Sequence, residues 1–334
     1  MTEGENALAF WKDKKILVTG GAGFIGSEVV RQLHEIGARV KVLDNFTSGK
    51  PQYLNGLNIE IMCGDICDKE TVTNALKDQE MVAHLAALPF IPDCYVNPGA
   101  FFQVNTIGTM NLMWGAIQSE SAEKFVHVSS SEVYGSAKYI PMDENHPTLP
   151  QSTYAASKLA ADRAVFTLHK EHDFPAVIIR PFNSYGPCIT QPYIVPEIIT
   201  QLFHGNHVRL GNVESSRDFT YVSDTAGGII LALTKEKAIG ETINLCSGSD
   251  IKIRDLASLI ARLMGKNIRL EQDESRFRPY DVERLLGDCT KAKRVLGWGP
   301  KIPLEEGIRR TIEWVKSNPI EFKEPFKGWP RAMR

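Results

Sequence analysis

Residues 15–26 read K-I-L-V-T-G-G-A-G-F-I-G, and this stretch decides the fold. The apolar run Lys15–Thr19 predicts a short buried strand, and the amphipathic segment after the glycines predicts a helix. Gly20, Gly23 and Gly26 would allow, in that order, a sharp turn, a close approach of the backbone to a pyrophosphate, and tight packing of the helix on the strand. The stretch therefore predicts the first unit of a dinucleotide-binding α/β sheet.

Asp44 follows a second predicted strand, which reads R-V-K-V-L. A carboxylate at this place can accept hydrogen bonds from both hydroxyls of a ribose and repels a 2′-phosphate, which favours NAD over NADP. The order strand, glycine turn, helix, strand and aspartate is far more specific than the glycines alone; the alternative is a structural turn with an incidental aspartate. Phe24, Ile25 and Asn45 are further candidates for contacts with the cofactor.

Two more predicted strands, Asn58–Cys63 and Glu80–Leu85, end in turns that suit a cofactor site. The carboxylate of Asp65 either bonds the adenine amino group or caps the helix that begins near Asp68, and we favour the cofactor contact. Small residues after the second of these strands would let the cofactor lie against the backbone. The candidate cofactor contacts in the two turns are Asp65, Ile66, Leu85, Ala86 and Ala87.

The segment Ser129–Lys158 carries the candidate catalytic groups: it begins S-S-S-E-V-Y-G after a fifth strand, K-F-V-H-V, and ends Y-A-A-S-K. Tyr154 and Lys158 project from one face of a predicted helix, where the ammonium would stabilise the phenolate and lower the pKa of the tyrosine. Ser130 and Glu132 join them because catalytic groups in open α/β sheets gather at the carboxyl ends of strands. The alternative for Tyr154 and Lys158 is an exposed pair on a helix with no catalytic role. The alternative for Glu132 is a structural role, in which its carboxylate caps a helix or pairs with Lys158.

A sixth strand, Ala176–Arg180, makes an α/β fold with a Rossmann-type doubly wound parallel sheet the economical interpretation. A long helix over residues 100–117 is predicted before the fifth strand. Its Asn105 is either a structural tie or a contact on the cofactor side, and we favour the structural tie. The chain has 334 residues, which is long enough for a second lobe.

Composition and charge exclude several classes of function. The net charge of −2 and the absence of a basic run argue against nucleic acid and anionic membranes as partners. No apolar stretch is long enough to span a bilayer, and without a signal-peptide pattern a cytoplasmic protein is expected. The six cysteines form no C-x-x-C pair, so we expect buried thiols and no metal site.

Seven motifs together resemble the extended short-chain dehydrogenase/reductases, in particular the NAD-dependent sugar epimerase/dehydratase family. The resemblance extends from about Lys14 to Ser317. It implies NAD as cofactor and a smaller C-terminal α/β domain that binds a nucleotide-diphosphate sugar. The motifs are T-G-G-A-G-F-I-G, H-L-A-A, S-S-S-E-V-Y-G, Y-A-A-S-K, R-P-F-N-S-Y-G-P, R-D-F-T-Y-V-S-D and R-P-Y-D-V-E-R-L-L-G-D.

The resemblance also implies a domain division and a quaternary structure. The NAD-binding domain would comprise residues 14–185 with a returning segment at about 222–247. The substrate-binding domain would comprise 186–221 and 248–317, and residues 1–13 and 318–334 would be terminal extensions. A homodimer is implied, built from the helices around 101–117 and 154–170, although packing within one chain would explain their apolar residues equally well.

The resemblance assigns roles to individual residues. Tyr154 would take the proton of a sugar hydroxyl, Ser130 would hold that hydroxyl, and Lys158 would bond the nicotinamide ribose. Asn183 would contact the sugar diphosphate, and Ser131 would contact the sugar. Two arginines, Arg217 and Arg278, would face the nucleotide or its phosphates, because guanidinium groups bind phosphate through paired hydrogen bonds. The alternative for Arg217 is a surface ion pair with Asp218. The alternative for Arg278 is that Arg276 contacts the nucleotide or its phosphates instead.

Glu132 decides the expected reaction. The resemblance gives this position to the base of 4,6-dehydratases, which removes the C5 proton after C4 has been oxidised and so yields a 4-keto-6-deoxy sugar. The triplet Ser130-Ser131-Glu132 resembles the Thr-Ser-Glu of GDP-mannose 4,6-dehydratases and lacks the aspartate acid of dTDP-glucose 4,6-dehydratases. Either Glu132 would then be both base and acid, or a water would help.

Other interpretations stay open. Much of the C-terminal half resembles legionaminic-pathway dehydratases that act on nucleotide-linked N-acetylglucosamine, so the resemblances disagree about the sugar. A nucleotide-sugar 4-epimerase and a UDP-glucuronate decarboxylase are alternative enzymes of the same fold. A non-catalytic cofactor-binding protein is the alternative from a different class, and the intact Ser–Tyr–Lys set argues against it.

Overall fold

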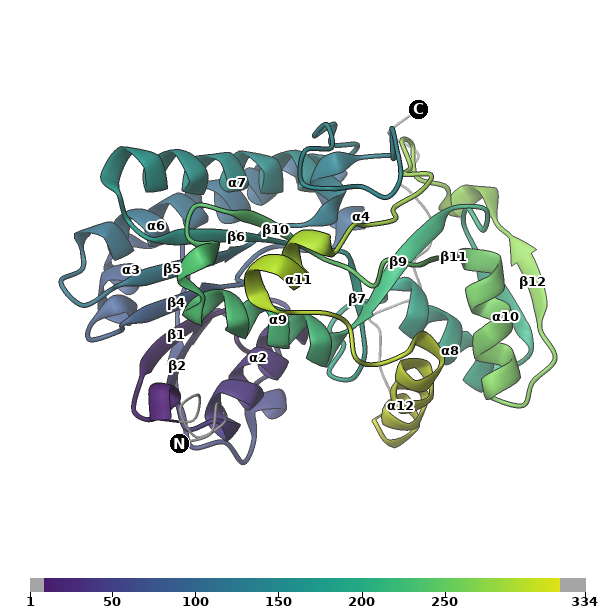
Figure 1. Cartoon of the computed structure of the whole chain (residues 1–334). Coiled ribbons are helices and arrows are strands. Elements are labelled where there is room, and N and C mark those ends of the chain that lie inside the picture. Colours follow the sequence, from purple (N-terminus) through teal and green to yellow (C-terminus); the bar gives the residue numbers. More distant parts are fainter. Residues whose placement is uncertain (1–8, 319–334) are drawn as a thin grey trace.

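A seven-stranded parallel sheet forms the larger of two lobes (Figure 1), and its strand order is β3-β2-β1-β4-β5-β6-β10. The structure, a computed structural model, describes residues 9–318. Neighbouring strands are parallel throughout, which confirms the predicted Rossmann-type doubly wound α/β fold. The strands are β1 (Lys15–Thr19), β2 (Arg39–Asp44), β3 (Glu60–Cys63), β4 (Met81–His84), β5 (Lys124–Val128), β6 (Ala176–Pro181) and β10 (Thr242–Leu245).

Helices cover both faces of this sheet because successive residues of its buried strands point to opposite sides. Ile16 and Val18 of β1 join one apolar core with α2, α9 and α11, and Leu17 joins the other core with α3, α6 and α7. Both cores contain residues that are completely buried. The helices are α2 (Phe24–Glu35), α3 (Lys69–Leu76), α6 (Thr109–Gln118), α7 (Thr153–His172), α9 (Val222–Thr234) and α11 (Thr290–Leu296).

The strand order reverses between β1 and β4, which are hydrogen-bonded neighbours at the centre of the sheet. In open α/β sheets such a reversal leaves a crevice outside the carboxyl ends of the strands, and ligands bind there. The predicted glycine turn follows β1, and Ala86 and Ala87 follow β4. The fold therefore brings two of the predicted cofactor-binding turns to one crevice.

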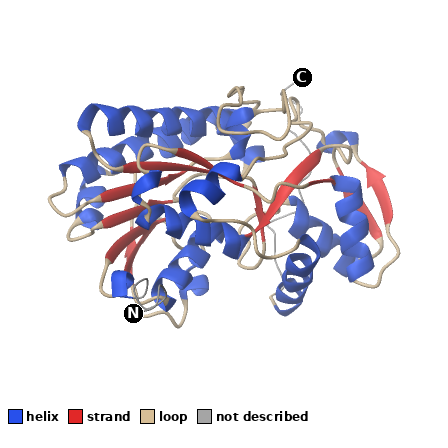
Figure 2. Cartoon of the chain, viewed as in Figure 1, coloured by secondary structure: helices blue, strands red, loops and turns tan. Residues whose placement is uncertain are grey.

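The smaller lobe lies beyond β7 and combines two short sheets with three helices (Figures 1 and 2). Its core contains fully buried residues such as Ile198, Leu256 and Ile308 from three different helices. The elements are β7 (Asn183–Tyr185), α8 (Ile194–His204), β8 (His207–Leu210), β9 (Ser216–Tyr221), β11 (Asp250–Lys252), α10 (Ile253–Leu263), β12 (Arg269–Gln272) and α12 (Leu304–Ser317). Helix α11 is an exception to the implied division, because it packs on α9 and β10 of the larger lobe.

The predicted long helix over residues 100–117 forms, but its hydrogen-bonding pattern changes in the middle. A π-helical stretch, Phe102–Gly108, separates the short helix α5 (Pro98–Phe101) from α6. Asn105 lies in this stretch, and its side chain accepts a hydrogen bond from the Leu88 N–H at 2.8 Å and donates to the Ser157 hydroxyl at 3.0 Å. The side chain is thus a structural tie, as expected.

The expectation of buried thiols holds only in part. All six cysteines are free, and Cys94 and Cys246 are buried, but Cys63 is exposed because it ends β3 at the edge of the sheet. Among the described residues, no group of His, Cys, Asp or Glu side chains could hold a metal ion. No helix within residues 9–318 is long and apolar enough to cross a membrane. The residues before 9 and after 318, which include most of the predicted terminal extensions, lie outside the described part.

Candidate active site

One cavity of about 430 Å³ lies between the two lobes, and every predicted site residue lines it. The structure thus brings together side chains from the glycine turn, from four strand ends, from α7 and from the smaller lobe. The residues are Gly20, Gly23, Phe24, Ile25, Gly26, Asp44, Asn45, Asp65, Ile66, Leu85, Ala86, Ala87, Ser130, Ser131, Glu132, Tyr154, Lys158, Asn183, Arg217 and Arg278.

The glycine turn leaves room only for backbone. Gly20 has a φ of 70°, and a Cβ there would lie 2.6 Å from the backbone nitrogen of Ala86. A Cβ on Gly26 would collide with the carbonyl oxygen of Gly20. The first turn of α2 has no side-chain cap. Its amide groups and the positive end of the helix dipole therefore suit a pyrophosphate that approaches closely.

Asp44 lies at the end of β2 and ties the turns around the cavity together. Its Oδ2 accepts a hydrogen bond from the Ala22 N–H at 2.9 Å, and its Oδ1 accepts one from the Phe46 N–H at 2.8 Å. Each carboxylate oxygen has a second lone pair, so both can also accept a ribose hydroxyl. The geometry therefore suits the predicted ribose contact.

Asp65 does not cap the next helix, because Asp68 does. The Asp68 side chain accepts hydrogen bonds from the backbone N–H groups of Glu70 and Thr71, so Asp68 is the cap of α3. Asp65 Oδ1 accepts a hydrogen bond from the Cys67 N–H at 2.8 Å in the turn before it. The Asp65 carboxylate also accepts a hydrogen bond from the Asn45 side chain at 2.9 Å. Asn45 and Asp65 thus form a polar pair at the cavity wall, where the adenine contact of Asp65 is predicted.

Tyr154 and Ser130 form the centre of the candidate catalytic group. Burial raises the pKa of Tyr154 to about 12, although the hydrogen bond with Ser130 acts in the opposite direction. The expected lowering of this pKa by Lys158 is not found, because the Lys158 ammonium donates to the carbonyl oxygen of Val128 at 2.7 Å. The phenol is therefore neutral in this structure.

Lys158 is buried beside a network that sequence reasoning missed. Burial lowers the pKa of Lys158 to about 8, and the negative charge of Asp162 acts against this shift. The buried Asp162 carboxylate accepts hydrogen bonds from the Ser129 hydroxyl at 3.1 Å and from Arg180 Nε at 2.8 Å. Asp162 lies four residues after Lys158 on α7, a spacing that places both side chains on the same face of the helix. This spacing is the feature of the sequence from which the pair could have been predicted.

The other titratable groups around Lys158 carry no compensating charge. The pKa of His84 on β4 is lowered to about 3, and that of His127 on β5 is lowered well below its ordinary value, in both cases chiefly by burial. Both imidazoles are thus neutral at pH 7. Tyr154 is neutral as well, so Asp162 is the carboxylate that keeps Lys158 protonated.

We expect the variant Asp162→Asn to lose activity at a lower pH than the wild type. Without the carboxylate the pKa of Lys158 falls below about 8, so its proton is lost earlier as the pH rises, and the alkaline limb of kcat/KM should move down by about one pH unit or more. The matched control is Glu171→Gln, which changes an exposed carboxylate of α7. An alkaline limb that stays in place in a folded Asp162→Asn protein would contradict the assignment.

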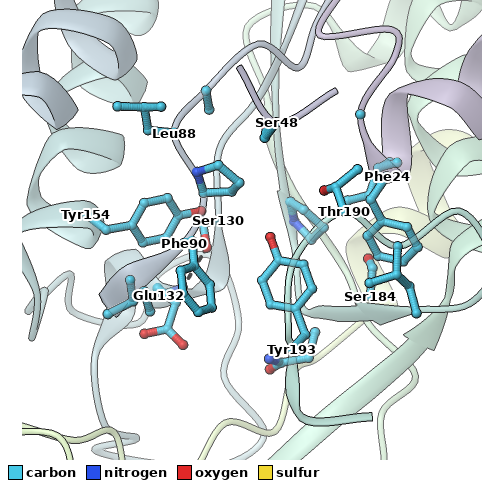
Figure 3. Close-up of a pocket in the computed structure, with 18 of the residues that line it drawn as sticks. Phe24, Ser48, Leu88, Phe90, Ser130, Glu132, Tyr154, Ser184, Thr190 and Tyr193 are labelled. Atoms are coloured by element: carbon cyan, nitrogen blue, oxygen red, sulfur yellow. Dashed lines mark hydrogen bonds between the residues drawn. The ribbon is translucent and has the colours of Figure 1, made fainter. Parts of the chain in front are cut away.

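Glu132 lies in the short turn after β5 and faces the cavity. Figure 3 shows its carboxylate on the side of the cavity that carries Tyr154 and Ser130. Neither structural alternative describes its side chain: Ser130 is the residue that caps the turn, and Lys158 bonds a backbone carbonyl. The charge of Glu132 acts on the pKa values of Tyr154 and Arg217, so the carboxylate lies near both.

Arg217 and Arg278 approach one carboxylate in the smaller-lobe half of the cavity. Each guanidinium has a nitrogen 3.6 Å from Asp281 Oδ1. The surface pair of Arg217 with Asp218 does not form, because Arg217 is buried and Asp218 accepts hydrogen bonds from Ser247 at 2.7 and 2.6 Å. At 3.6 Å these contacts are long, so both guanidinium groups could release Asp281 and bind a phosphate in its place.

Two further polar groups lie in this half of the cavity. Arg276, the alternative to Arg278, donates to the Glu197 carboxylate at 2.8 Å, so it is engaged in a different ion pair. The Oδ1 atom of Asn183 is buried and has no hydrogen-bond partner among the described residues. A buried acceptor of this kind is costly unless a ligand satisfies it, which fits the predicted substrate contact.

The cavity also contains two aromatic residues, one of them in the proline-rich loop Pro89–Pro98, which the sequence suggests as a wall of the substrate site. Phe90 belongs to the proline-rich loop after β4, and Tyr193 is the residue immediately before α8. Their rings contact each other edge to face, with centroids 6.3 Å apart (Figure 3). A loop aromatic has no periodic signal, so only the folded chain shows that the two meet.

Comparisons with known proteins agree with this geometry. The family model described as GDP-mannose 4,6 dehydratase matches residues 17–311. The dTDP-glucose 4,6-dehydratase of Streptomyces antibioticus is 32% identical over 330 residues, which cover 94% of this chain and 96% of that protein. DesIV, a dTDP-glucose 4,6-dehydratase from Streptomyces venezuelae solved with NAD and TYD bound, has a TM-score of 0.85 at 30% identity and covers 91% of this chain and 97% of its own. UDP-glucose 4-epimerase from Thermotoga maritima, solved with UDP-glucose, has a TM-score of 0.84 at 32% identity and covers 92% of this chain and 100% of its own.

Proposed function

Since this chain belongs to the short-chain dehydrogenase/reductase family of nucleotide-sugar dehydratases and epimerases, we propose that it is an NAD-dependent nucleotide-sugar 4,6-dehydratase. The observation that carries the proposal is the position of Glu132. Its carboxylate faces the same cavity as Tyr154 and Ser130, where a C5 proton beside a C4 ketone would lie (Figure 3). An enzyme that only oxidises and reduces C4 needs no such base.

NAD is the cofactor that this cavity fits. The backbone of the glycine turn would hold the pyrophosphate, and Asp44 would hold the adenosine ribose. When bound, NAD accepts a hydride from C4 and later returns it to C6, and its positively charged ring lowers the pKa of a neighbouring phenol. Lys158 would complete the site by bonding the nicotinamide ribose, for which its ammonium leaves the Val128 carbonyl.

The residues of the chain divide the proton transfers between them. Tyr154 takes the proton from the C4 hydroxyl, while Ser130 holds that hydroxyl in position. The C4 ketone makes the C5 hydrogen acidic, and Glu132 removes it as a proton. The C5–C6 double bond then forms, the C6–O bond breaks, and the proton passes from Glu132 to the departing hydroxide to give water. The hydride then returns to C6, a proton from solvent reaches C5 through Glu132, and Tyr154 releases to solvent the proton that it took from the C4 hydroxyl, which completes the 4-keto-6-deoxy sugar.

The substrate that we propose is a nucleoside diphosphate linked to a hexose. Arg217 and Arg278 would exchange Asp281 for the phosphates, because a bidentate arginine–phosphate pair is stronger than a contact at 3.6 Å. The buried Oδ1 atom of Asn183 would accept a hydrogen bond from the same ligand. The base and the hexose differ among the matching proteins, which act on dTDP-glucose or UDP-glucose by name.

A 4-epimerase is the second candidate function, favoured by the similarity to the Thermotoga maritima UDP-glucose 4-epimerase. Both reactions begin with oxidation at C4 by the same tyrosine. They differ afterwards, because an epimerase turns the ketone over and reduces it on the other face. The fate of the C5 hydrogen therefore separates the two functions.

The proposed function is tested with a panel of dTDP-glucose, UDP-N-acetylglucosamine and GDP-mannose in D₂O. We expect one of them to give a 4-keto-6-deoxy product with deuterium at C5, read by proton nuclear magnetic resonance and mass spectrometry. Deuterium enters because the original C5 proton leaves in the water, and the hydrogen that Glu132 delivers to C5 comes from solvent. Recovery of a sugar inverted at C4 with no deuterium at C5 would replace the dehydratase with the epimerase.

We also infer a homodimer. Four large apolar side chains on the segment from the π-helical stretch into α6 are between 40% and 47% exposed: Phe102, Ile107, Met110 and Trp114. An exposed apolar row of this kind on a helix suits burial against a second copy of the chain. Analytical ultracentrifugation should give about twice the monomer mass, and Trp114→Glu should shift the protein toward the monomer.

A further inference from the structure

We propose that Phe90 and Tyr193 form an aromatic barrier that stops the ketone intermediate from turning over in the cavity and so directs the reaction to elimination. This inference rests on the proposed function, because it concerns the intermediate that follows oxidation at C4. It adds two residues that decide the outcome of the reaction without acting as acid or base.

The barrier spans the cavity from one lobe to the other. Phe90 comes from the loop after β4 of the larger lobe, and Tyr193 comes from the segment before α8 of the smaller lobe. Their rings meet at an interplanar angle of 68°, and the Tyr193 ring also contacts Phe24 with centroids 6.4 Å apart. Figure 3 shows the Tyr193 ring standing in the cavity between Phe90 and Phe24.

The segment that carries Tyr193 is held in place at both ends. The Ile189 carbonyl accepts a hydrogen bond from the Tyr53 hydroxyl at 2.8 Å, and the Ile189 side chain is buried against Phe24 and Val222. The Tyr193 carbonyl accepts a hydrogen bond from the Glu197 N–H at 2.9 Å in the first turn of α8. The backbone on either side of Tyr193 is therefore anchored, and its ring rests against Phe90 and Phe24 of the larger lobe.

Tyr193 faces Tyr154 but cannot replace it. Burial, and secondarily the proximity of Tyr154, raise the pKa of Tyr193, and no cation acts on it in the opposite direction. The Tyr193 phenol is thus neutral at pH 7. What it brings to the cavity is volume on the side opposite Tyr154.

Volume at this place separates the two reactions of the family. Inversion at C4 requires the sugar ring to turn over, so that its opposite face is reduced, and this turn needs open space across from Tyr154. Elimination requires the ring to stay where it was oxidised, with its C5 hydrogen near Glu132. A rigid aromatic pair in the space for the turn favours elimination.

The test compares Tyr193→Ala, Tyr193→Phe and wild type, each with NAD and with the panel sugar that the wild type dehydrates. We expect the ratio of C4-inverted sugar to 4-keto-6-deoxy product to rise at least tenfold in Tyr193→Ala, because the wall is gone. Tyr193→Phe keeps the ring and should keep the wild-type ratio. Tyr139→Ala is the matched control, since it removes an exposed tyrosine outside the cavity.

The outcomes separate the barrier from the proposed function. A wild type that inverts C4 without deuterium at C5 overturns both. If the wild type dehydrates and Tyr193→Ala dehydrates with the same ratio, only the barrier is wrong. An equal rise in Tyr193→Phe and Tyr193→Ala would also overturn it, because the hydroxyl and not the ring would then be responsible.

A second measurement keeps the test decisive if Tyr193→Ala fails to fold by circular dichroism. Phe90→Leu shortens the other half of the barrier and should raise the same ratio. Binding of the substrate and of its C4 epimer is measured by calorimetry for the NAD-loaded protein. We expect the wild type to bind one epimer at least tenfold more tightly and Phe90→Leu to lose most of this preference; an unchanged preference together with an unchanged ratio would contradict the barrier.

Discussion

Glu132→Gln should stop the elimination while leaving the first oxidation intact. Glutamine keeps the size of the side chain and its place in the turn after β5, but it cannot accept the C5 proton. A positioned general base contributes about 10²–10⁴ to a rate, so kcat for the 4-keto-6-deoxy product should fall by about that factor. The C4 ketone should still form, because Tyr154 and Ser130 are unchanged.

Two signals distinguish this result from a general loss of activity. Absorbance of the reduced cofactor should accumulate in Glu132→Gln mixed with substrate, since its reoxidation depends on elimination. Deuterium at C5 of the recovered sugar should disappear. Glu120→Gln, which alters an exposed carboxylate, serves as the control and should behave like the wild type in both signals. Normal deuterium incorporation by Glu132→Gln would assign the base to another residue.

The larger lobe could be predicted from the sequence because each of its strands and turns is marked by residues that are close together in the chain. Apolar runs predicted the strands, and the glycines between Gly20 and Gly26 predicted the turn, since a Cβ at either end would collide with backbone. The end of a strand also predicts where polar side chains gather in an open sheet. For this reason all the predicted site residues line one cavity, although no two segments that carry them are adjacent in sequence.

Three features depend on contacts between distant segments and could not be predicted in this way. The π-helical stretch contains Asn105, whose side chain bonds the loop that carries Leu88, whereas helix propensity alone predicts a regular α-helix there. The pKa of Tyr154 follows burial and not the nearby ammonium. The barrier of Phe90 and Tyr193 forms only when both lobes are folded. In each case tertiary packing outweighs the local pattern.

Tyr154→Phe should abolish every step of the reaction, not only the last ones. Without the phenol oxygen nothing accepts the C4 proton, so no ketone forms and the C5 hydrogen stays unreactive. We expect kcat to fall by about 10³–10⁴, with no reduced-cofactor absorbance and no deuterium at C5. This pattern differs from that of Glu132→Gln, in which the first oxidation persists.

The fold should tolerate this substitution, which makes the loss of activity interpretable. The Tyr154 ring packs in a small apolar cluster, edge to face with Phe101 at 6.3 Å between centroids, and phenylalanine retains that contact. Only the hydrogen bond with Ser130 is lost, so the free energy of unfolding should change by about 1 kcal/mol or less. Tyr139→Phe is the matched control at the surface. A Tyr154→Phe protein that is folded and still exchanges C5 would show that oxidation at C4 does not depend on this phenol, and the order of steps built on it would fail.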